Sequence, residues 1–91
     1  MRKIEQQMWE AINSLNNWDG SNTTVFHTNR GAVVYLHGHH IASVNATTGK
    51  VTVNKTTLAA YPTNTTKSRL RALGVDVYTK NGITYLDGEE I

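Results

Sequence analysis

The middle of the chain alternates short β-forming runs with turn residues, and this alternation constrains the fold more than any other feature. Four runs are rich in β-branched and aromatic side chains, at residues 23–28, 32–37, 40–44 and 50–53. Three segments rich in Gly and Asn separate them, at residues 29–31, 38–39 and 45–49. Because hairpin-length links join antiparallel neighbours, the pattern predicts a four-stranded antiparallel meander.

An amphipathic helix is predicted before the meander, over residues 2–16. Its apolar side chains recur at three- and four-residue steps and form one stripe, made of Ile4, Met8, Ala11, Ile12 and Leu15. Trp9 flanks this stripe. Since Met8 and Trp9 add more apolar surface than one small sheet covers, the N-terminal helix is also a candidate contact for a homodimer.

A second, shorter helix is predicted after a connector at residues 56–62. Pro62 pushes the residue before it into extended geometry, so a new element begins after it. Thr63 or Thr65 can cap a helix whose body covers residues 66–73. Gly74 suits the position just beyond the end of that helix.

A β-hairpin is predicted at the end of the chain. Asn81-Gly82 is the strongest two-residue hairpin signal, and it lies between β-forming residues 75–80 and 83–87. A two-residue turn there places Tyr78 opposite Tyr85. The final residues, 88–91, are expected to be loose.

These elements predict an α+β fold in a single domain over residues 1–91, with the order α-β-β-β-β-α-β-β. An antiparallel sheet would pack the N-terminal helix, the second short helix or both on one face. The sequence has no cysteine, so disulfides and thiolate metal sites are excluded. That absence favours a reducing compartment, and we expect a cytoplasmic protein without a membrane partner.

The second predicted helix carries the densest run of positive charge. Its cations are Lys67, Arg69 and Arg71, while Leu70 and Leu73 mark its buried side. The cations are therefore expected to face solvent. Hydroxyls and free N–H groups at a helix start attract phosphate, so the pattern predicts a nucleic-acid contact. The residues predicted to bind nucleic acid are Arg30, Lys55, Thr65, Thr66, Lys67, Ser68, Arg69 and Arg71. An ordinary solvated amphipathic helix is the alternative interpretation.

The histidines form a second candidate constellation. His37, His39 and His40 surround Gly38, and His27 lies on the preceding strand. Three neutral imidazoles could bind zinc, which would give a metal-dependent enzyme. No carboxylate stands near them in sequence, and polar turn residues are the alternative. We therefore expect no metal and no cofactor.

Two segments resemble a pattern in small accessory proteins of tailed bacteriophages. The segments are Leu36-His37-Gly38-His39-His40-Ile41-Ala42 and Thr63-Asn64-Thr65-Thr66-Lys67-Ser68-Arg69-Leu70. The resemblance covers roughly residues 1–73 and includes the opening Met1-Arg2-Lys3-Ile4 helix start. It implies a phage-encoded protein in the cytoplasm of the host bacterium, and it implies no particular activity.

Three functions follow as hypotheses. The first is a non-enzymatic protein that binds DNA or RNA through the basic helix. The second is a phage inhibitor that binds a host or defence protein, such as a polymerase or a CRISPR complex. The third is the histidine-based metal enzyme. The sequence has no nucleophile elbow, phosphate-binding loop or His-Glu-X-X-His motif, so a non-enzymatic role is expected.

Overall fold

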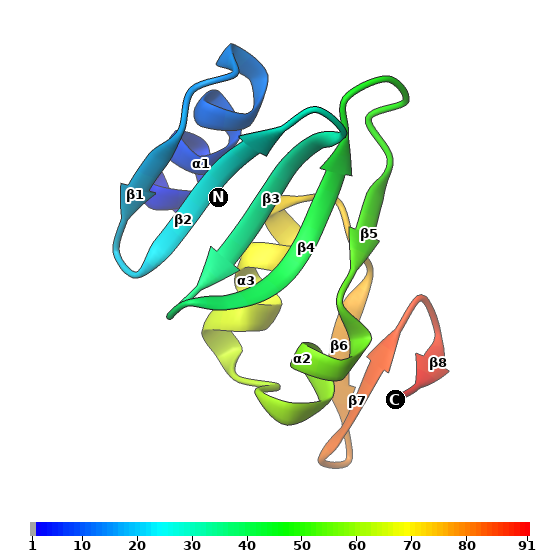
Figure 1. Ribbon diagram of the computed structural model, residues 1–91. Coiled ribbons are helices and arrows are strands. Elements are labelled where there is room, and N and C mark those ends of the chain that lie inside the picture. Colours follow the sequence, from blue (N-terminus) through cyan, green and yellow to red (C-terminus); the bar gives the residue numbers. More distant parts are fainter. Residues whose placement is uncertain (1) are drawn as a thin grey trace.

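The chain folds into two antiparallel sheets and three helices in a computed structural model that describes residues 2–91 (Figure 1). The elements are α1 (Lys3–Ser14), β1 (Trp18–Gly20), β2 (Thr23–Thr28), β3 (Gly31–Leu36), β4 (His39–Asn45), β5 (Val51–Val53), α2 (Lys55–Ala60), α3 (Asn64–Ala72), β6 (Val77–Lys80), β7 (Ile83–Leu86) and β8 (Glu89–Glu90). The predicted α+β class and element order are confirmed. Three short elements, β1, α2 and β8, are added to the predicted order.

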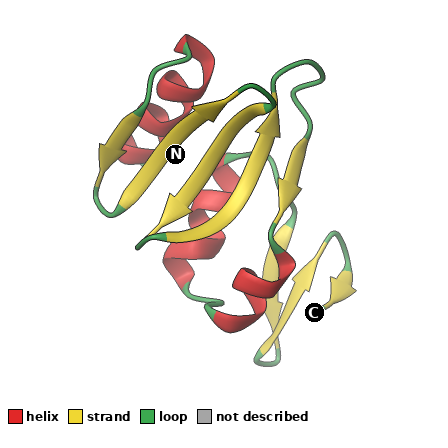
Figure 2. Cartoon of the chain, in the orientation of Figure 1, coloured by secondary structure: helices red, strands yellow, loops and turns green. Residues whose placement is uncertain are grey.

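The larger sheet has five strands in the order β1-β2-β3-β4-β5, all antiparallel. Helix α1 packs on β1 and β2, and α3 packs behind β4 (Figure 1). The short α2 contacts β4 near the lower end of the sheet in the same view. No helix crosses the front face of this sheet in Figure 2, so that face is uncovered.

The core fills the space between the large sheet and the helices. Met8 of α1, Leu58 of α2 and Leu70 of α3 are almost completely buried there. Val25 of β2 and Val34 of β3 form a cross-strand pair, and both side chains are fully buried in this core. Met8, Ala11 and Ile12 of the predicted apolar stripe therefore form the surface that holds α1 to the sheet. Leu15 was predicted on the same stripe, but it lies just beyond the helix and is 74% exposed.

A β-bulge in β4 lets two consecutive residues point into the core. Val34 pairs with Ala42 and Tyr35 pairs with His40, so Ile41 has no partner on β3. Ile41 and Ala42 are both buried, while His40 stays opposite Tyr35 on the other face. The extra residue bends the strand and changes which side chains face the helices.

The connector predicted at residues 56–62 is largely helical instead. Asn54 caps α2 by accepting a hydrogen bond from the Thr57 N–H, and its buried Leu58 anchors the helix. Leu58 is the one buried residue of α2, and one buried position gave too little periodicity for the sequence pattern to predict a helix. None of the helices within residues 2–91 has the length and apolarity needed to cross a membrane.

The C-terminal segment forms the smaller sheet, in the order β6-β7-β8. Asn81 and Gly82 both have positive φ, at 53° and 76°, and Tyr78 lies opposite Tyr85 as predicted. The stacked tyrosine rings are 5.2 Å apart. The expectation of a loose tail is wrong, because Glu89 and Glu90 pair with β7.

Candidate functional site

The cations of α3 do not form the exposed row that the sequence predicts. Lys67 is 5% exposed and Arg69 is 3% exposed. The Lys67 ammonium donates to the Thr79 hydroxyl of β6. Arg69 Nη1 lies 2.9 Å from Glu5 Oε2 of α1, and Arg69 Nε donates to Thr23 Oγ1 at 3.0 Å. The expectation that Lys67 and Arg69 face solvent is therefore wrong, because α1, β2 and β6 pack against this helix.

The remaining predicted positions on α3 have mixed surroundings. Arg71 is exposed, although its Nε donates to the Val77 carbonyl at 2.9 Å. Thr66 is buried, and its backbone N–H donates to the capping Thr63 hydroxyl. Thr65 and Ser68 are half-buried, and Ser68 Oγ donates to Glu5 Oε2 at 2.6 Å. Of this helix, only Arg71 presents a cation to solvent.

Glu5 is the centre of a buried polar network that joins α1 to α3. Burial raises the pKa of Glu5, but hydrogen bonds from Ser68, Arg69 and the Arg2 backbone N–H outweigh that effect. The pKa of this carboxyl therefore lies below its ordinary value, and Glu5 holds its negative charge. Within residues 2–91, every buried side-chain polar atom has a hydrogen-bond partner.

One sequence signal points to this network. Glu5 is three residues before Met8 and seven before Ile12, which places it on the apolar stripe of α1. A carboxylate on a buried stripe needs a buried cation or several N–H donors. The position of Glu5 therefore predicts that a cation or several N–H donors lie beside it inside the fold.

The two other predicted nucleic-acid residues lie outside α3 and are exposed. Lys55 is the first residue of α2. Arg30 lies in the turn between β2 and β3, where its backbone N–H donates to Thr28 Oγ1 at 3.2 Å. The Ala46 N–H donates to the Arg30 carbonyl at 3.0 Å, so this turn is held at both ends. The eight predicted residues therefore do not form one surface.

The uncovered face of the large sheet brings other side chains together. His27 contacts the Ala11 carbonyl of α1, so its neighbours Phe26 and Thr28 point to the opposite, uncovered side. Cross-strand pairing then places further side chains beside them. We call this surface the open face, and it consists of Thr24, Phe26, Thr28, Val33, Tyr35, His40, Ser43 and Thr52.

Aromatic side chains dominate the middle of the open face. Phe26 is 50% exposed and lies opposite Val33 on β3. Tyr35 and His40 form the next cross-strand pair, with ring centroids 5.7 Å apart. The strands are predictable from the sequence, but alternation along them does not show which alternate residues remain uncovered.

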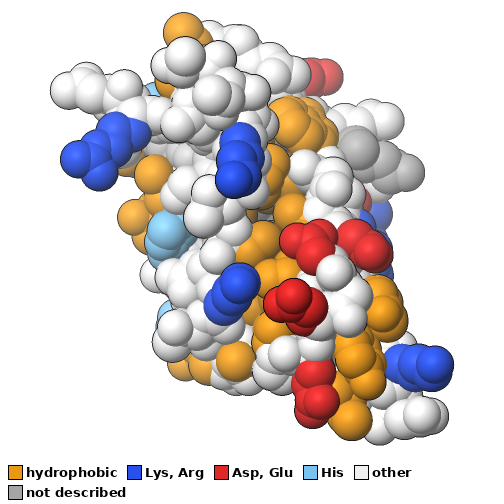
Figure 3. Space-filling view, turned by 90° about the vertical axis from the view of Figure 1, so that its right-hand side faces the viewer, with side chains coloured by type: hydrophobic (Ala, Val, Ile, Leu, Met, Phe, Trp, Pro, Cys, Tyr) orange, Lys and Arg blue, Asp and Glu red, His pale blue; other side chains and the backbone are white. Residues whose placement is uncertain are grey.

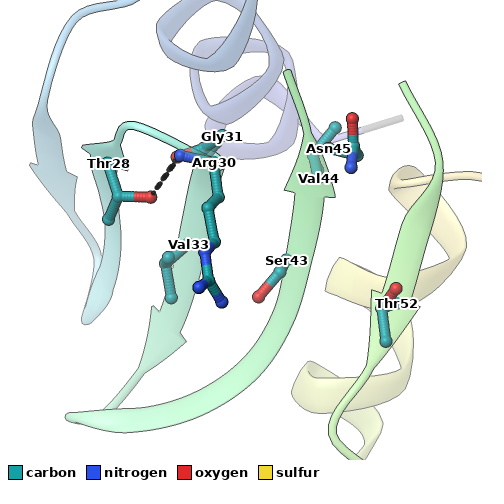
Figure 4. Close-up of a pocket in the computed structure, with 9 residues that line it drawn as sticks. Thr28, Arg30, Gly31, Val33, Ser43, Val44, Asn45 and Thr52 are labelled. Carbon is teal, nitrogen blue, oxygen red and sulfur yellow. Dashed lines mark hydrogen bonds between the residues drawn. The ribbon is translucent and has the colours of Figure 1, made fainter. Parts of the chain in front are cut away.

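Arg30 extends over this face. Figure 4 shows its side chain passing between Val33 and Ser43, in a shallow pocket of about 220 Å³. Asp19 lies on the edge strand β1, where its carboxylate accepts a hydrogen bond from Thr24 Oγ1 at 3.4 Å. The open face is thus an aromatic and hydroxyl surface with Arg30 at one end and an acid on the edge strand β1.

The histidines are dispersed. His27 faces α1, His39 stacks on Tyr61 with centroids 4.3 Å apart, and His40 contacts Ser43 Oγ at 2.9 Å. His37 is exposed in the β3–β4 turn. Across residues 2–91, no three His, Asp or Glu side chains come together in an arrangement suited to a metal ion.

The family described as Kyanoviridae Gp96 protein matches the chain over residues 1–91. No curated protein and no solved structure shows a significant match.

Proposed function

Because the chain belongs to the Kyanoviridae Gp96 protein family, a bacteriophage family, we propose that it is a non-enzymatic phage accessory protein that binds a protein partner through its open face. The observation that carries this proposal is the half-exposed Phe26 in the middle of a sheet face that no helix covers. The proposed partner is a protein of the infected bacterium.

The composition of the open face supports a protein partner. The centres of protein interfaces are enriched in aromatic residues and arginine and depleted in Lys, Glu and Asp. Phe26, Tyr35 and Arg30 match this composition, and the hydroxyl side chains around them can form hydrogen bonds at the rim. The backbone of these hydrogen-bonded antiparallel strands is already ordered, so binding a partner there loses little conformational entropy.

The charge distribution favours a protein over nucleic acid. Binding to the phosphate backbone depends on several Lys and Arg side chains acting together. Lys67 and Arg69 are buried inside the fold, and Arg30 is the only cation among the described residues that line the pocket on the open face. A mostly apolar partner surface with one acidic group opposite Arg30 is the best chemical match.

Affinity capture with matched variants tests this proposal. Wild-type protein, Phe26→Thr and Tyr78→Thr would be used to capture proteins from a lysate of the host bacterium. Phe26 and Tyr78 are both exposed strand aromatics, but Tyr78 lies on the smaller sheet. We expect a partner that wild type and Tyr78→Thr retain and Phe26→Thr loses. Equal retention by all three would overturn the proposal.

An oligonucleotide binding assay at increasing salt tests the competing class of partner. We expect no measurable affinity for duplex or single-stranded oligonucleotides at low salt. Affinity that falls steeply with salt, and that is lost in Arg30→Gln/Lys55→Gln, would replace the protein partner with nucleic acid.

A further inference from the structure

A groove separates the edge strand β5 from the smaller sheet. The two sheets share no strand pairing, and the groove between them has a volume of about 470 Å³. Val51 and Val53 form one wall, and Val75 and Leu86 form the other. Val51, Val53 and Val75 are only partly buried, so the groove exposes an apolar strip.

The two sides of this groove carry opposite charge. Lys50 and Lys55 flank the β5 side, which we call the basic side. On the other side Asp87 lines the groove, and Asp76, Glu89 and Glu90 lie next to it; we call these four residues the acidic side. Asp87 lines the groove and its N–H donates to the Asp76 carbonyl at 2.8 Å, while Glu89 pairs with Leu86. Figure 3 shows the acidic side chains gathered beside an apolar strip, with Lys or Arg side chains on its other side.

These charges have no partners within the fold. Among residues 2–91, Glu5 and Arg69 form the only ion pair. All six side chains of the basic and acidic sides are exposed. Both sides are therefore available to a complementary surface.

We propose that the partner for this groove is a second copy of the same chain, in a two-fold symmetric dimer. A two-fold axis that runs along the apolar strip places the basic side of one copy on the acidic side of the other. The same operation lays each apolar strip on its counterpart. A surface with one sign of charge could not be self-complementary in this way.

Pairing of the two β5 edges is a different arrangement, and the charges disfavour it. Lys50 and Lys55 flank the two ends of the three-residue strand β5, so an antiparallel β5–β5 ladder would bring lysines of the two copies near each other at both ends. Lysines at a short edge strand are a common protection against pairing of this kind. The inferred contact is therefore groove against groove, and it leaves the open face of each copy free.

Charge-reversal variants of the full chain test the dimer by analytical ultracentrifugation. Wild type should sediment as a dimer whose dissociation constant rises with salt. Lys50→Glu/Lys55→Glu and Glu89→Lys/Glu90→Lys should each be monomeric under the same conditions. An equimolar mixture of these two variants should restore a dimer, because each supplies the charge that the other lacks.

Two controls make the result specific. Lys3→Glu/Lys80→Glu changes the net charge as much as Lys50→Glu/Lys55→Glu does, but it alters residues that belong to neither the basic side nor the acidic side, and it should remain dimeric. Circular dichroism should show that every variant is folded, since the substituted side chains are exposed. A monomeric wild type at all concentrations and salt levels would overturn the proposal. So would a mixture that associates no better than its separate components.

Discussion

Arg69 Nη1 of α3 lies 2.9 Å from Glu5 Oε2 of α1, and both side chains are 4% exposed. Removing one member of such a pair leaves an uncompensated buried charge, so Arg69→Met should lower the free energy of unfolding by roughly 3–5 kcal/mol. Urea denaturation of wild type and variant measures this loss. The double variant Glu5→Gln/Arg69→Met should lose less than the sum of the two single variants. Strict additivity would contradict the pairing.

Stability should fall at acidic pH through Glu5. Its pKa is lower in the folded chain than in the unfolded chain, so the unfolded state binds the proton more readily. The resulting stabilisation is complete above the unfolded pKa and disappears as pH falls through the folded pKa. Urea denaturation across the acidic range measures this slope. Glu5→Gln should flatten the slope, and an unchanged slope in that variant would assign the acid sensitivity to other carboxylates.

Gly31 should tolerate no side chain at the start of β3. Its φ is 144°, and a Cβ there would lie 2.0 Å from the Val44 carbonyl oxygen. Gly38 serves as the control, since it has a φ of 78° and open space around it. Gly38→Ala should cost roughly 1–2 kcal/mol from the left-handed backbone alone. Gly31→Ala should cost clearly more in the same thermal or urea unfolding experiment, and equal costs would contradict the close approach.

Lys67 should contribute to the free energy of unfolding mainly through the aliphatic part of its side chain. It is buried and has no acid partner, and its ammonium donates to the Thr79 hydroxyl. Lys67→Met keeps the stem and removes the charge, so it should leave the free energy of unfolding unchanged or raise it. Lys67→Ala removes the stem and should be the less stable variant. A larger loss in Lys67→Met than in Lys67→Ala, measured by urea denaturation, would show that the ammonium dominates.

Most of the secondary structure was predictable because its causes are local. The period of α1, the capping Thr63 and the Asn81-Gly82 turn each act within a few residues. The sequence pattern did not predict the short α2, because Leu58 is its single buried position. A helix this short is stabilised by its tertiary contact with β4 and not by its own sequence.

The candidate site was much harder to predict. Lys67 and Arg69 look like solvent-facing cations when α3 is considered alone. The surface that remains free, around Phe26, depends on which side of the sheet the helices occupy. Alternation along a strand gives two faces, but it does not say which one stays uncovered.

Local spacing alone determined that this chain would form an N-terminal amphipathic helix, an antiparallel meander and a terminal hairpin. Only the tertiary structure decided where its charges act. Arg69 donates a hydrogen bond to Glu5, which is 64 residues away in the sequence. Because of that contact, Arg69 joins α3 to α1 inside the fold and is not available to bind a ligand. The physical reason is that burial and charge pairing depend on neighbours in space, which the period of a single helix does not encode.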